Sequence, residues 1–411
     1  MAYDVAQVRG LYPALANGSA FLDGAAGTQV PSAVIDAIAD AYRRGIGNSG
    51  GAFPASERSG AITAAARAAV ADLVRGDPSG VVFGPNMTTL TYRFAHTLAR
   101  TWGAGDEVIV SRLDHDANVR PWVQAAERAG ARVVWAEIDP ATGELPAAQY
   151  RDLLTERTRL VAVTAASNVL GVRPDVPAIA AIAHEAGALT YVDGVHSTPH
   201  GPVDMAELGA DFYATSAYKW SGPHVGAVIA DPALLAELRP EKLLPAPDDV
   251  PGRFETGTPP YADLAGVAAA VDHLAGLDPE AAGDRRARLM TSMAAVRAYE
   301  ESLFAGLWQR LTALPGVTAY GPAAIGTAHD GAAGRTATAY FTVAGHTPRQ
   351  VTEHLAAHRI NAWDGHNYAW EATGALGLRD GGGAVRVGLV HYNDRREVDR
   401  LIAALGELTG A

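Results

Sequence analysis

The sequence predicts an α/β fold in which a mainly parallel sheet is followed by a smaller α+β layer. Between residues 80 and 231, short apolar segments alternate with helical segments, which is typical of β-α-β units. Polar side chains suited to catalysis follow five of these segments, and ligands bind at that edge of an open α/β sheet. From about residue 285, a long helical segment leads into mixed strands and helices, which indicates a second, smaller unit.

The expected elements follow in order along the chain. A short strand from Phe21 ends in small residues, Pro31 opens a helix, and Gly45–Gly51 is a flexible loop that suits a lid or a subunit contact. Residues 62–75 form an amphipathic helix, with apolar side chains on one face. The later expected strands begin at residues 81 and 159 or span residues 107–111, 132–138, 189–193, 212–216, 226–231 and 384–392. The later expected helices span residues 176–187, 285–312, 348–359 and 394–408, and residues 336–344 form a further segment of the smaller layer.

The composition limits the classes of function. The chain has 411 residues, of which 48% are hydrophobic and 19% are charged, so it can bury an ample core. A net charge of −12 argues against nucleic acid and anionic membrane surfaces as partners. The absence of cysteine excludes disulfides, thiolate metal sites and a cysteine nucleophile. No signal peptide and no apolar stretch long enough to span a bilayer is visible, so we expect a cytoplasmic protein without a membrane partner.

Lys219 stands at the exit of the apolar segment 212–216, close to Ser216 and Tyr218. A lysine at the end of a buried strand is partly desolvated, which makes it nucleophilic enough to form a Schiff base. The local alternative is a lysine that extends to the surface from a loop. One strand earlier, Asp193 ends a second apolar segment, and a buried aspartate needs a cationic or hydrogen-bonding partner. A protonated pyridine nitrogen is such a partner, and pyridoxal phosphate (PLP) sites combine an Asp at that nitrogen with a Lys at the aldehyde.

Two further segments suit a phosphorylated ligand. Asn86, Met87 and Thr88 follow a short strand and open a helix, where backbone N–H groups and hydroxyls bind phosphate. The local alternative is an ordinary threonine N-cap. His115 follows the strand 107–111 and offers an imidazole face for an aromatic ring, although the segment also suits a surface loop. Asp114 and Asp116 flank it, but three consecutive residues do not readily face one metal ion, and we expect no metal site.

The Asp193 strand followed by Ser216-x-x-Lys219 resembles the class V aminotransferase family of fold-type I PLP enzymes, most closely its cysteine-desulfurase-like branch. The resemblance covers nearly the whole chain. It implies a seven-stranded, mainly parallel sheet in a large PLP-binding domain at residues 21–284 and a small α+β domain at 285–411, on which residues 1–20 pack. It also implies a homodimer with shared active sites.

The resemblance assigns a role to each matching residue. His115 stacks on the pyridine ring, and Asn168 reaches the cofactor's phenolic oxygen or the substrate carboxylate. Thr258 contacts the cofactor phosphate of the partner, and Arg386 binds the α-carboxylate of an amino-acid substrate. Without the resemblance, Arg386 would be an exposed arginine on an edge strand. The remaining cofactor contacts are Asn86, Met87, Thr88, Asp193, His196, Ser216, Tyr218 and Lys219.

The departures from the family pattern bear on the reaction. Cysteine desulfurases carry a cysteine in a loop of the small domain, and Tyr368 stands in its place after Gly365-His366. His196 replaces a frequent Gln and Tyr218 a frequent His, and both substitutes can donate hydrogen bonds. Trp363 replaces an Arg near the substrate mouth, where His366 also lies, which favours a bulkier or less polar substrate.

The leading functional hypothesis is a C–S lyase that eliminates sulfur from Cβ of an amino acid without an enzyme persulfide. Lys219, Asp193, His115 and Tyr368 are its expected catalytic residues, and Asn168, Trp363, His366 and Arg386 its expected substrate contacts. Transamination, epimerisation and carbon–carbon bond formation begin with the same removal of the Cα proton and stay open. A PLP-binding protein without turnover is the alternative from another class.

Overall fold

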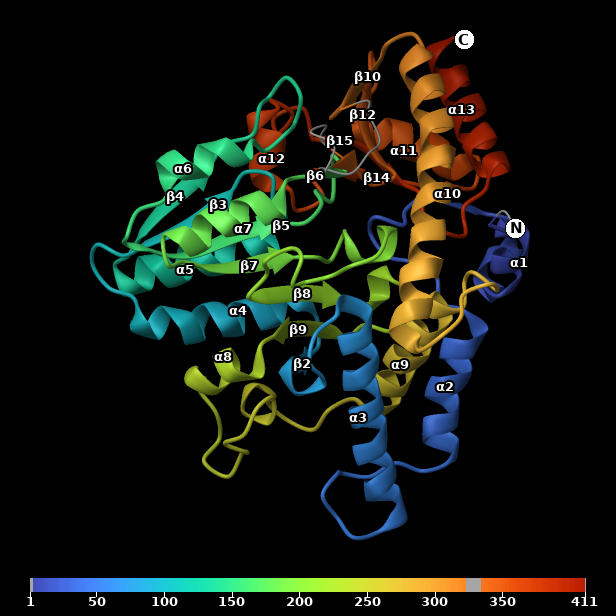
Figure 1. The fold of residues 1–411 in the computed structure, drawn as a ribbon. Coiled ribbons are helices and arrows are strands. Elements are labelled where there is room, and N and C mark those ends of the chain that lie inside the picture. The colour runs from blue at the N-terminus through green and yellow to red at the C-terminus, as the bar shows by residue number, and fades with distance from the viewer. Residues whose placement is uncertain (1–2, 323–333, 411) are drawn as a thin grey trace.

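The computed structural model describes residues 3–322 and 334–410 (Figure 1). Residues 1–2, 323–333 and 411 belong to the predicted N-terminal segment and small domain and lie outside the described residues. The described chain forms two larger sheets, each covered by helices. The boundaries between the three predicted parts remain predictions.

The larger sheet has seven strands in the order β2-β9-β8-β7-β5-β3-β4. Only β9 runs against its neighbours, so the predicted mainly parallel sheet of seven strands is confirmed. The central strands are apolar along their whole length because both faces of the sheet are covered. The strands are β2 Val81–Gly84, β3 Glu107–Ser111, β4 Arg132–Ala136, β5 Thr158–Thr164, β7 Leu189–Asp193, β8 Phe212–Ser216 and β9 Gly226–Ala230.

Helices cover both faces of this sheet (Figure 1). One core cluster joins a sheet face to α4 Met87–Leu98, α5 Arg120–Ala129 and α8 Pro232–Glu237. The other face packs against a second cluster with residues from α2 Ser32–Arg43, α3 Pro54–Val74, α7 Val176–Glu185 and α9 Tyr261–Ala275. The remaining short helices are α6 Tyr150–Leu153 and the 3₁₀ turns η1 Pro13–Asn17, η2 Pro78–Gly80, η3 Ala99–Thr101, η4 Asp116–Asn118, η5 Ala147–Gln149, η6 Thr198–His200, η7 Ala217–Lys219 and η8 Gly252–Phe254.

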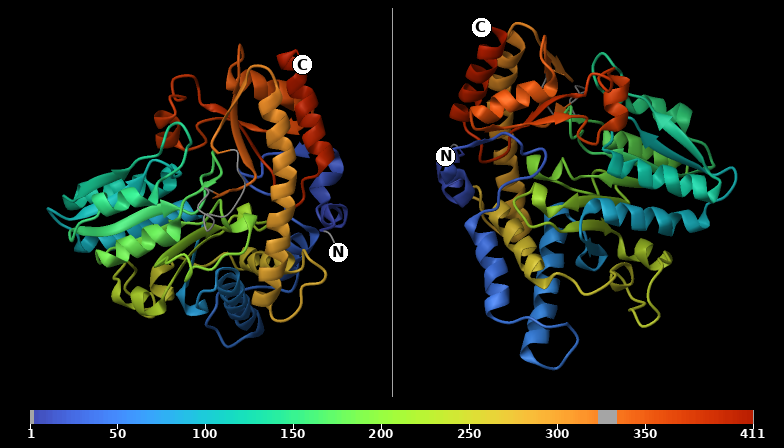
Figure 2. Two further views of the ribbon diagram at one scale, coloured as in Figure 1. Left: turned by 45° about the horizontal axis from the view of Figure 1, so that its top comes forward. Right: turned by 180° about the vertical axis from the view of Figure 1, so that it is seen from behind.

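The second sheet is antiparallel, with the strand order β10-β12-β15-β14, and has its own apolar core. Its strands are β10 Val317–Tyr320, β12 Thr338–Val343, β14 Trp363–Gly365 and β15 Ala384–Gly388. The long helix α10 leads from the large sheet to this layer, and α13 lies beside it (Figures 1 and 2). The helices of this part are α10 Arg285–Ala313, α11 Pro348–Ala357, α12 Trp370–Ala375 and α13 Arg395–Thr409.

Short strand pairs connect segments that are distant in the sequence. The N-terminal strand β1 Ala20–Phe21 pairs with β13 Ile360–Asn361, and β6 Val172–Arg173 pairs with β11 Gly334–Arg335. The first helix, α1 Val5–Gly10, contacts the C-terminal helix through an ion pair of 2.9 Å between Arg9 Nη1 and Glu397 Oε2. These contacts place the second sheet over the edge of the large sheet where β5, β7 and β8 end.

Several expected element bounds differ from the structure, among them those of α3, β15 and β4. Helix α3 begins at Pro54 instead of residue 62, because its first two turns lack the apolar spacing that marks the rest, although Pro54 at its start and Glu57 in its first turn favour a helix there. Strand β15 ends at Gly388 instead of residue 392. Gly388 also forms an isolated bridge with Asp23, and the chain leaves the sheet after it. Strand β4 ends at residue 136 instead of 138.

No helix within residues 3–322 and 334–410 has both the length and the apolar character that crossing a membrane requires.

The close approach of β9 to the start of α4 generates a stability prediction. A Cβ atom on Gly226 would lie 2.2 Å from the carbonyl carbon of Asn86 and 2.5 Å from the backbone nitrogen of Met87. We expect Gly226→Ala to lower the free energy of unfolding by about 1–3 kcal/mol, because backbone must move. Gly60→Ala is the matched control, since Gly60 lies in α3 with open space around it and should gain roughly 0.5–1 kcal/mol. Urea unfolding of both variants measures the difference, and equal effects would contradict the packing argument.

Candidate functional site

A pocket opens where β5, β7 and β8 end and α4 begins. It brings together nine of the predicted site residues, and a larger cleft between α7 and α10 contains none of them. The nine are Met87, Thr88, His115, Asn168, Asp193, His196, Ser216, Tyr218 and Lys219; Ala117, Thr164, Ala166 and Val195 complete the lining.

Lys219 is buried in this pocket, so the surface-lysine alternative is wrong. It follows β8 directly in the turn η7, and its Nζ donates a hydrogen bond of 2.6 Å to the carbonyl oxygen of Ala25. Burial, together with the positive charge of Arg386, lowers its pKa to about 7, although Asp193 acts in the opposite direction. A large fraction of the amine is therefore uncharged and nucleophilic near neutral pH.

Asp193 ends β7 and is also buried. Its Oδ1 accepts a hydrogen bond of 2.9 Å from the backbone N–H of Val195. Burial raises the pKa of this carboxyl to about 6, while that hydrogen bond and Lys219 lower it. A cation held against this carboxylate would be stabilised strongly, because the pocket excludes most of the water that would otherwise screen the charge.

His115 is partly buried just after β3, and a backbone N–H group two residues further along the chain holds its ring. Its Nδ1 accepts a hydrogen bond of 3.0 Å from the N–H of Ala117, so the neutral ring carries its proton on Nε2. Burial, Lys219 and Arg386 lower its pKa to about 3. The ring is therefore neutral at physiological pH and can lie flat against an aromatic ligand without adding charge.

The residues beside His115 point elsewhere, which argues against a metal ion at this turn. Asp114 accepts hydrogen bonds from Ser111 Oγ and, at 2.7 Å, from Asn118 Nδ2 in the interior. Burial raises the pKa of Asp114 to about 8. Asp116 instead pairs with Arg120 at 2.9 Å.

The start of α4 differs from the local alternative of a threonine N-cap. Asn86 is the N-cap, and its Oδ1 accepts a hydrogen bond of 2.9 Å from the N–H of Thr89. The N–H of Met87 donates to Ser216 Oγ at 3.0 Å, while Thr88 lines the pocket. Asn86 is not among the residues that line the pocket, and its contact with a cofactor remains a prediction.

Asn168 joins the pocket to the second sheet. Its Nδ2 donates a hydrogen bond of 2.8 Å to the backbone carbonyl oxygen of Asn367. The backbone carbonyl oxygen of Asn168 accepts a hydrogen bond of 3.0 Å from Arg386 Nη1. Among the described residues, its buried Oδ1 has no hydrogen-bond partner. Arg386 is buried in β15, an interior strand, so the exposed edge-strand alternative is wrong. Burial lowers the Arg386 pKa to about 10, which still leaves the guanidinium charged.

Tyr368 lies at the pocket mouth with 67% of its surface exposed. Its ring stacks on His115, with 5.5 Å between the ring centroids, and its carbonyl oxygen accepts a hydrogen bond of 2.7 Å from the N–H of Asp116. Asn367 and Tyr368 both have left-handed backbone angles, with φ of 48° and 59°. The exposed side chains of His366 and Trp363 lie near this loop in the sequence but do not line the pocket.

Three other predicted contacts have distinct surroundings. The Nε2 of His196 lies 3.1 Å from Thr336 Oγ1 and 3.0 Å from Thr338 Oγ1. The Tyr218 ring stacks on His224 at 4.7 Å between centroids. Thr258 is exposed in the loop before α9 and does not line the pocket of its own chain.

Sequence reasoning missed a buried network close to the lysine. The Tyr12 hydroxyl lies 2.8 Å from Ser221 Oγ, 2.7 Å from His273 Nε2 and 2.6 Å from His391 Nε2. Ser221 follows Lys219 by two residues, so this network fixes the chain just beyond the lysine. Four segments that are distant in the sequence supply its members, so no local pattern marks the network.

The unusual environment of Lys219 generates a titration prediction. The sequence contains only two lysines, Lys219 and Lys242, so ¹³C reductive methylation of ligand-free protein gives two lysine signals to follow by NMR beside that of the N-terminal amine. The Lys219→Arg variant identifies the Lys219 signal, because the N-terminal amine also titrates at about pH 8. We expect the Lys219 signal to titrate with a midpoint near pH 7. The Lys242→Arg variant identifies the Lys242 signal. A Lys219 midpoint near the ordinary lysine value of about 10.4 would contradict the buried geometry.

The chain resembles known proteins over almost its whole length. The model of the aminotransferase class-V family matches residues 20–401. A probable cysteine desulfurase of Pseudomonas putida is 33% identical, over 94% of this chain and 93% of the relative. The aminotransferase-like protein FGM3 of Gibberella zeae is 34% identical over 98% of each chain. The crystal structure of the cysteine desulfurase CsdA from Escherichia coli matches with a TM-score of 0.85 and 28% identity, covering 99% of this chain and 98% of that one. The chain therefore belongs to the class V aminotransferase family of PLP-dependent enzymes, among cysteine-desulfurase-like members.

Proposed function

We propose that the pocket holds PLP, with Lys219 bonded to the cofactor aldehyde and Asp193 at the pyridine nitrogen. The donor set supports this assignment, because a buried amine with a pKa near 7 and a buried carboxylate line the same pocket. The unpartnered Oδ1 of Asn168 also fits a polar ligand there. Thr88, the backbone at the start of α4 and Ser216 would hold the phosphate, with His115 against the ring.

When bound, PLP supplies an electron sink that makes the Cα proton of an attached amino acid acidic. Lys219 Nζ is the group that removes this proton, because its uncharged form is accessible near neutral pH. Asp193 keeps the ring nitrogen protonated through its negative charge. His115 stays neutral and excludes water from one side of the site.

An amino-acid substrate needs an anchor for its α-carboxylate, and Arg386 is suited to this role. Its guanidinium remains charged while buried, and one nitrogen already bonds to the backbone of Asn168 at the pocket. A carboxylate would face the remaining donors in a bidentate arrangement. Asn168 contacts both this arginine and the mouth loop, so it couples anchoring of the substrate to the position of that loop.

The favoured reaction is β-elimination of a sulfur group without an enzyme persulfide. The observation that carries it is Tyr368 on His115 at the mouth, in a chain without cysteine. Lys219 would take the Cα proton, and the sulfur would leave Cβ with the bonding electrons and accept a proton from the Tyr368 hydroxyl, which solvent would restore. Lys219 would then displace the enamine from the cofactor, and water would hydrolyse the enamine to pyruvate and ammonia.

The alternative reactions begin with the same removal of the Cα proton, but they differ in whether they need an acid at the pocket mouth. Transamination, epimerisation and carbon–carbon bond formation need no acid for a leaving group, so a purely steric role of Tyr368 would favour them. A PLP-binding protein without turnover would have no need of Lys219, Asp193 and Arg386 together around one pocket. We further propose a cytoplasmic homodimer in which the exposed Thr258 reaches the partner's cofactor.

Cofactor attachment is testable because the chain has two lysines. Borohydride should fix PLP to Lys219, and peptide mass mapping should leave Lys242 unmodified. Lys242→Arg should behave like the unaltered protein, whereas Lys219→Arg should lose the fixed cofactor. Stable label on Lys242 instead of Lys219 would refute the assignment.

The elimination proposal is tested with cysteine, cystine and cysteine S-conjugates, by assaying pyruvate, ammonia and the mass of the intact chain. We expect stoichiometric pyruvate and ammonia and no sulfur adduct on the protein. Tyr368→Phe removes only the hydroxyl and should lower kcat about 10²–10⁴-fold, the usual contribution of a general acid, with little change in substrate binding.

The control for this variant is a substrate whose leaving group needs no proton. Its turnover should be nearly unchanged in Tyr368→Phe. If turnover of every substrate is unchanged, Tyr368 is only a wall of the pocket and its role as the acid is refuted. Formation of a new amino acid from a 2-oxo acid, without pyruvate release, would identify an aminotransferase.

A further inference from the structure

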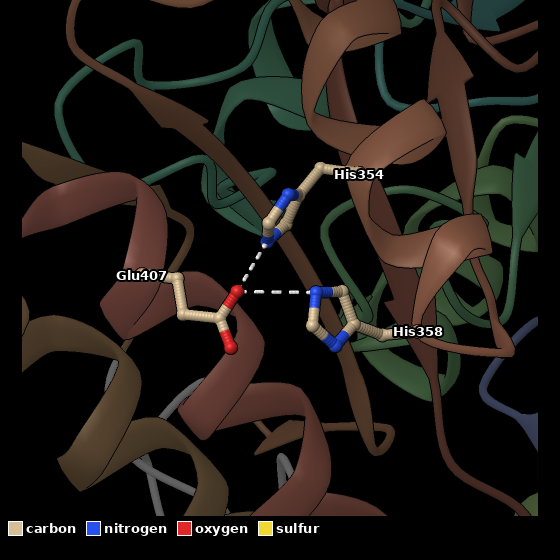
Figure 3. Close-up of side chains that lie close together, drawn as sticks. All are labelled: His354, His358 and Glu407. Atoms are coloured by element: carbon tan, nitrogen blue, oxygen red, sulfur yellow. Dashed lines mark ion pairs between the residues drawn. The ribbon is translucent and has the colours of Figure 1, made fainter.

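Three side chains with metal-binding atoms converge on the surface of the second layer, away from the PLP pocket (Figure 3). His354 and His358 are four residues apart near the C-terminal end of α11, so they project from one face. Glu407 comes from α13, which packs against α11. One atom from each side chain lies within 4.8 Å of the other two.

The distances approach those of a coordination shell. Glu407 Oε2 lies 3.1 Å from His358 Nε2 and 3.6 Å from His354 Nε2. Nitrogen and oxygen ligands bind zinc at about 2.0–2.2 Å, which places neighbouring ligand atoms roughly 3–3.5 Å apart. Small rotamer adjustments at a partly exposed site therefore suffice to surround an ion.

We propose that His354, His358 and Glu407 form a site for a divalent transition metal such as Zn²⁺, which ties α11 to α13. Two imidazoles and one carboxylate suit zinc, nickel or copper, whereas calcium and magnesium prefer oxygen ligands alone. The side chains are 23%, 35% and 57% exposed, so an ion can enter from solvent and water can complete its coordination.

Metal binding would replace one existing contact. The Nε2 of His354 donates a hydrogen bond of 2.9 Å to the carbonyl oxygen of Ala404. An ion at this nitrogen displaces its proton and the hydrogen bond. Without metal, the same side chains form the ion pairs drawn in Figure 3, which is the competing explanation for their convergence.

The site is placed to stabilise the layer that carries the pocket mouth. Helix α11 also contacts β14, where Asp364 accepts a hydrogen bond of 2.8 Å from Thr352 and pairs with Arg349 at 3.3 Å. Clamping α11 against α13 therefore restrains the helix that supports this strand. The expected effect is on thermal stability, since none of the three ligands lines the pocket.

The test uses holoenzyme without a polyhistidine tag, treated with chelator and dialysed. Calorimetric titration with Zn²⁺ should show one ion bound per chain and a raised Tm, with no effect of equal concentrations of Mg²⁺ or Ca²⁺. His358→Gln should weaken Zn²⁺ binding at least about tenfold and should abolish the rise in Tm. The factor follows because residues that only support the metal ligands already contribute that much to metal affinity.

His184→Gln is the matched control. His184 is half-exposed and pairs with a carboxylate, Asp211, at 2.9 Å, but alanines occupy the positions four residues away on either side. This variant should bind Zn²⁺ like the unaltered protein. Glu407→Gln, at an exposed position, provides a second ligand variant should His358→Gln fold poorly. Failure to bind Zn²⁺, or equal binding by both ligand variants and the unaltered chain, would overturn the proposal and leave the ion pairs as the function of the cluster.

Discussion

Burial of three charged side chains around one pocket is the constraint on which the rest of the site depends. Lys219, Asp193 and Arg386 each lose most of their contact with water, and burial of an ionised group costs free energy unless hydrogen bonds or opposite charge offset it. Burial brings the pKa values of Lys219 and Asp193 to about 7 and about 6, close to each other. Asp193 is thus only partly compensated within the described chain, and a pyridinium cation would complete the balance.

Three of the hydrogen bonds between the second sheet and this pocket end on backbone carbonyl groups. Asn168 bonds to the carbonyl of Asn367, Asp116 to that of Tyr368, and Arg386 to that of Asn168. Carbonyl groups do not depend on the identity of their side chains, so the mouth loop can exchange its side chains while it keeps its position. The predicted replacement of a cysteine by Tyr368 would therefore leave the backbone of this loop in place.

Much of the large sheet and the pocket could be predicted because both depend on local sequence. Buried parallel strands are continuous apolar runs, and residues such as Asp193 and Lys219 follow them directly. The start of α3 at Pro54 was missed because its first turns are polar. Burial of Arg386 and the contact of Tyr12 with His391 could not be foreseen, since they depend on segments that meet only in the folded chain. The role of each pocket residue toward PLP remains a prediction.

The backbone at the mouth favours a positioned side chain over a mobile one. Two consecutive residues, Asn367 and Tyr368, adopt the left-handed region, which costs an L-residue such as tyrosine roughly 1–2 kcal/mol. That conformation persists because the N–H of Asp116 binds the Tyr368 carbonyl and His115 supports the ring. A pocket wall needs bulk but no such exact backbone, whereas a proton donor must hold its hydroxyl within reach of the departing atom. The strain at Tyr368 therefore favours an acid over a wall, and with it elimination over the reactions that need no leaving-group proton.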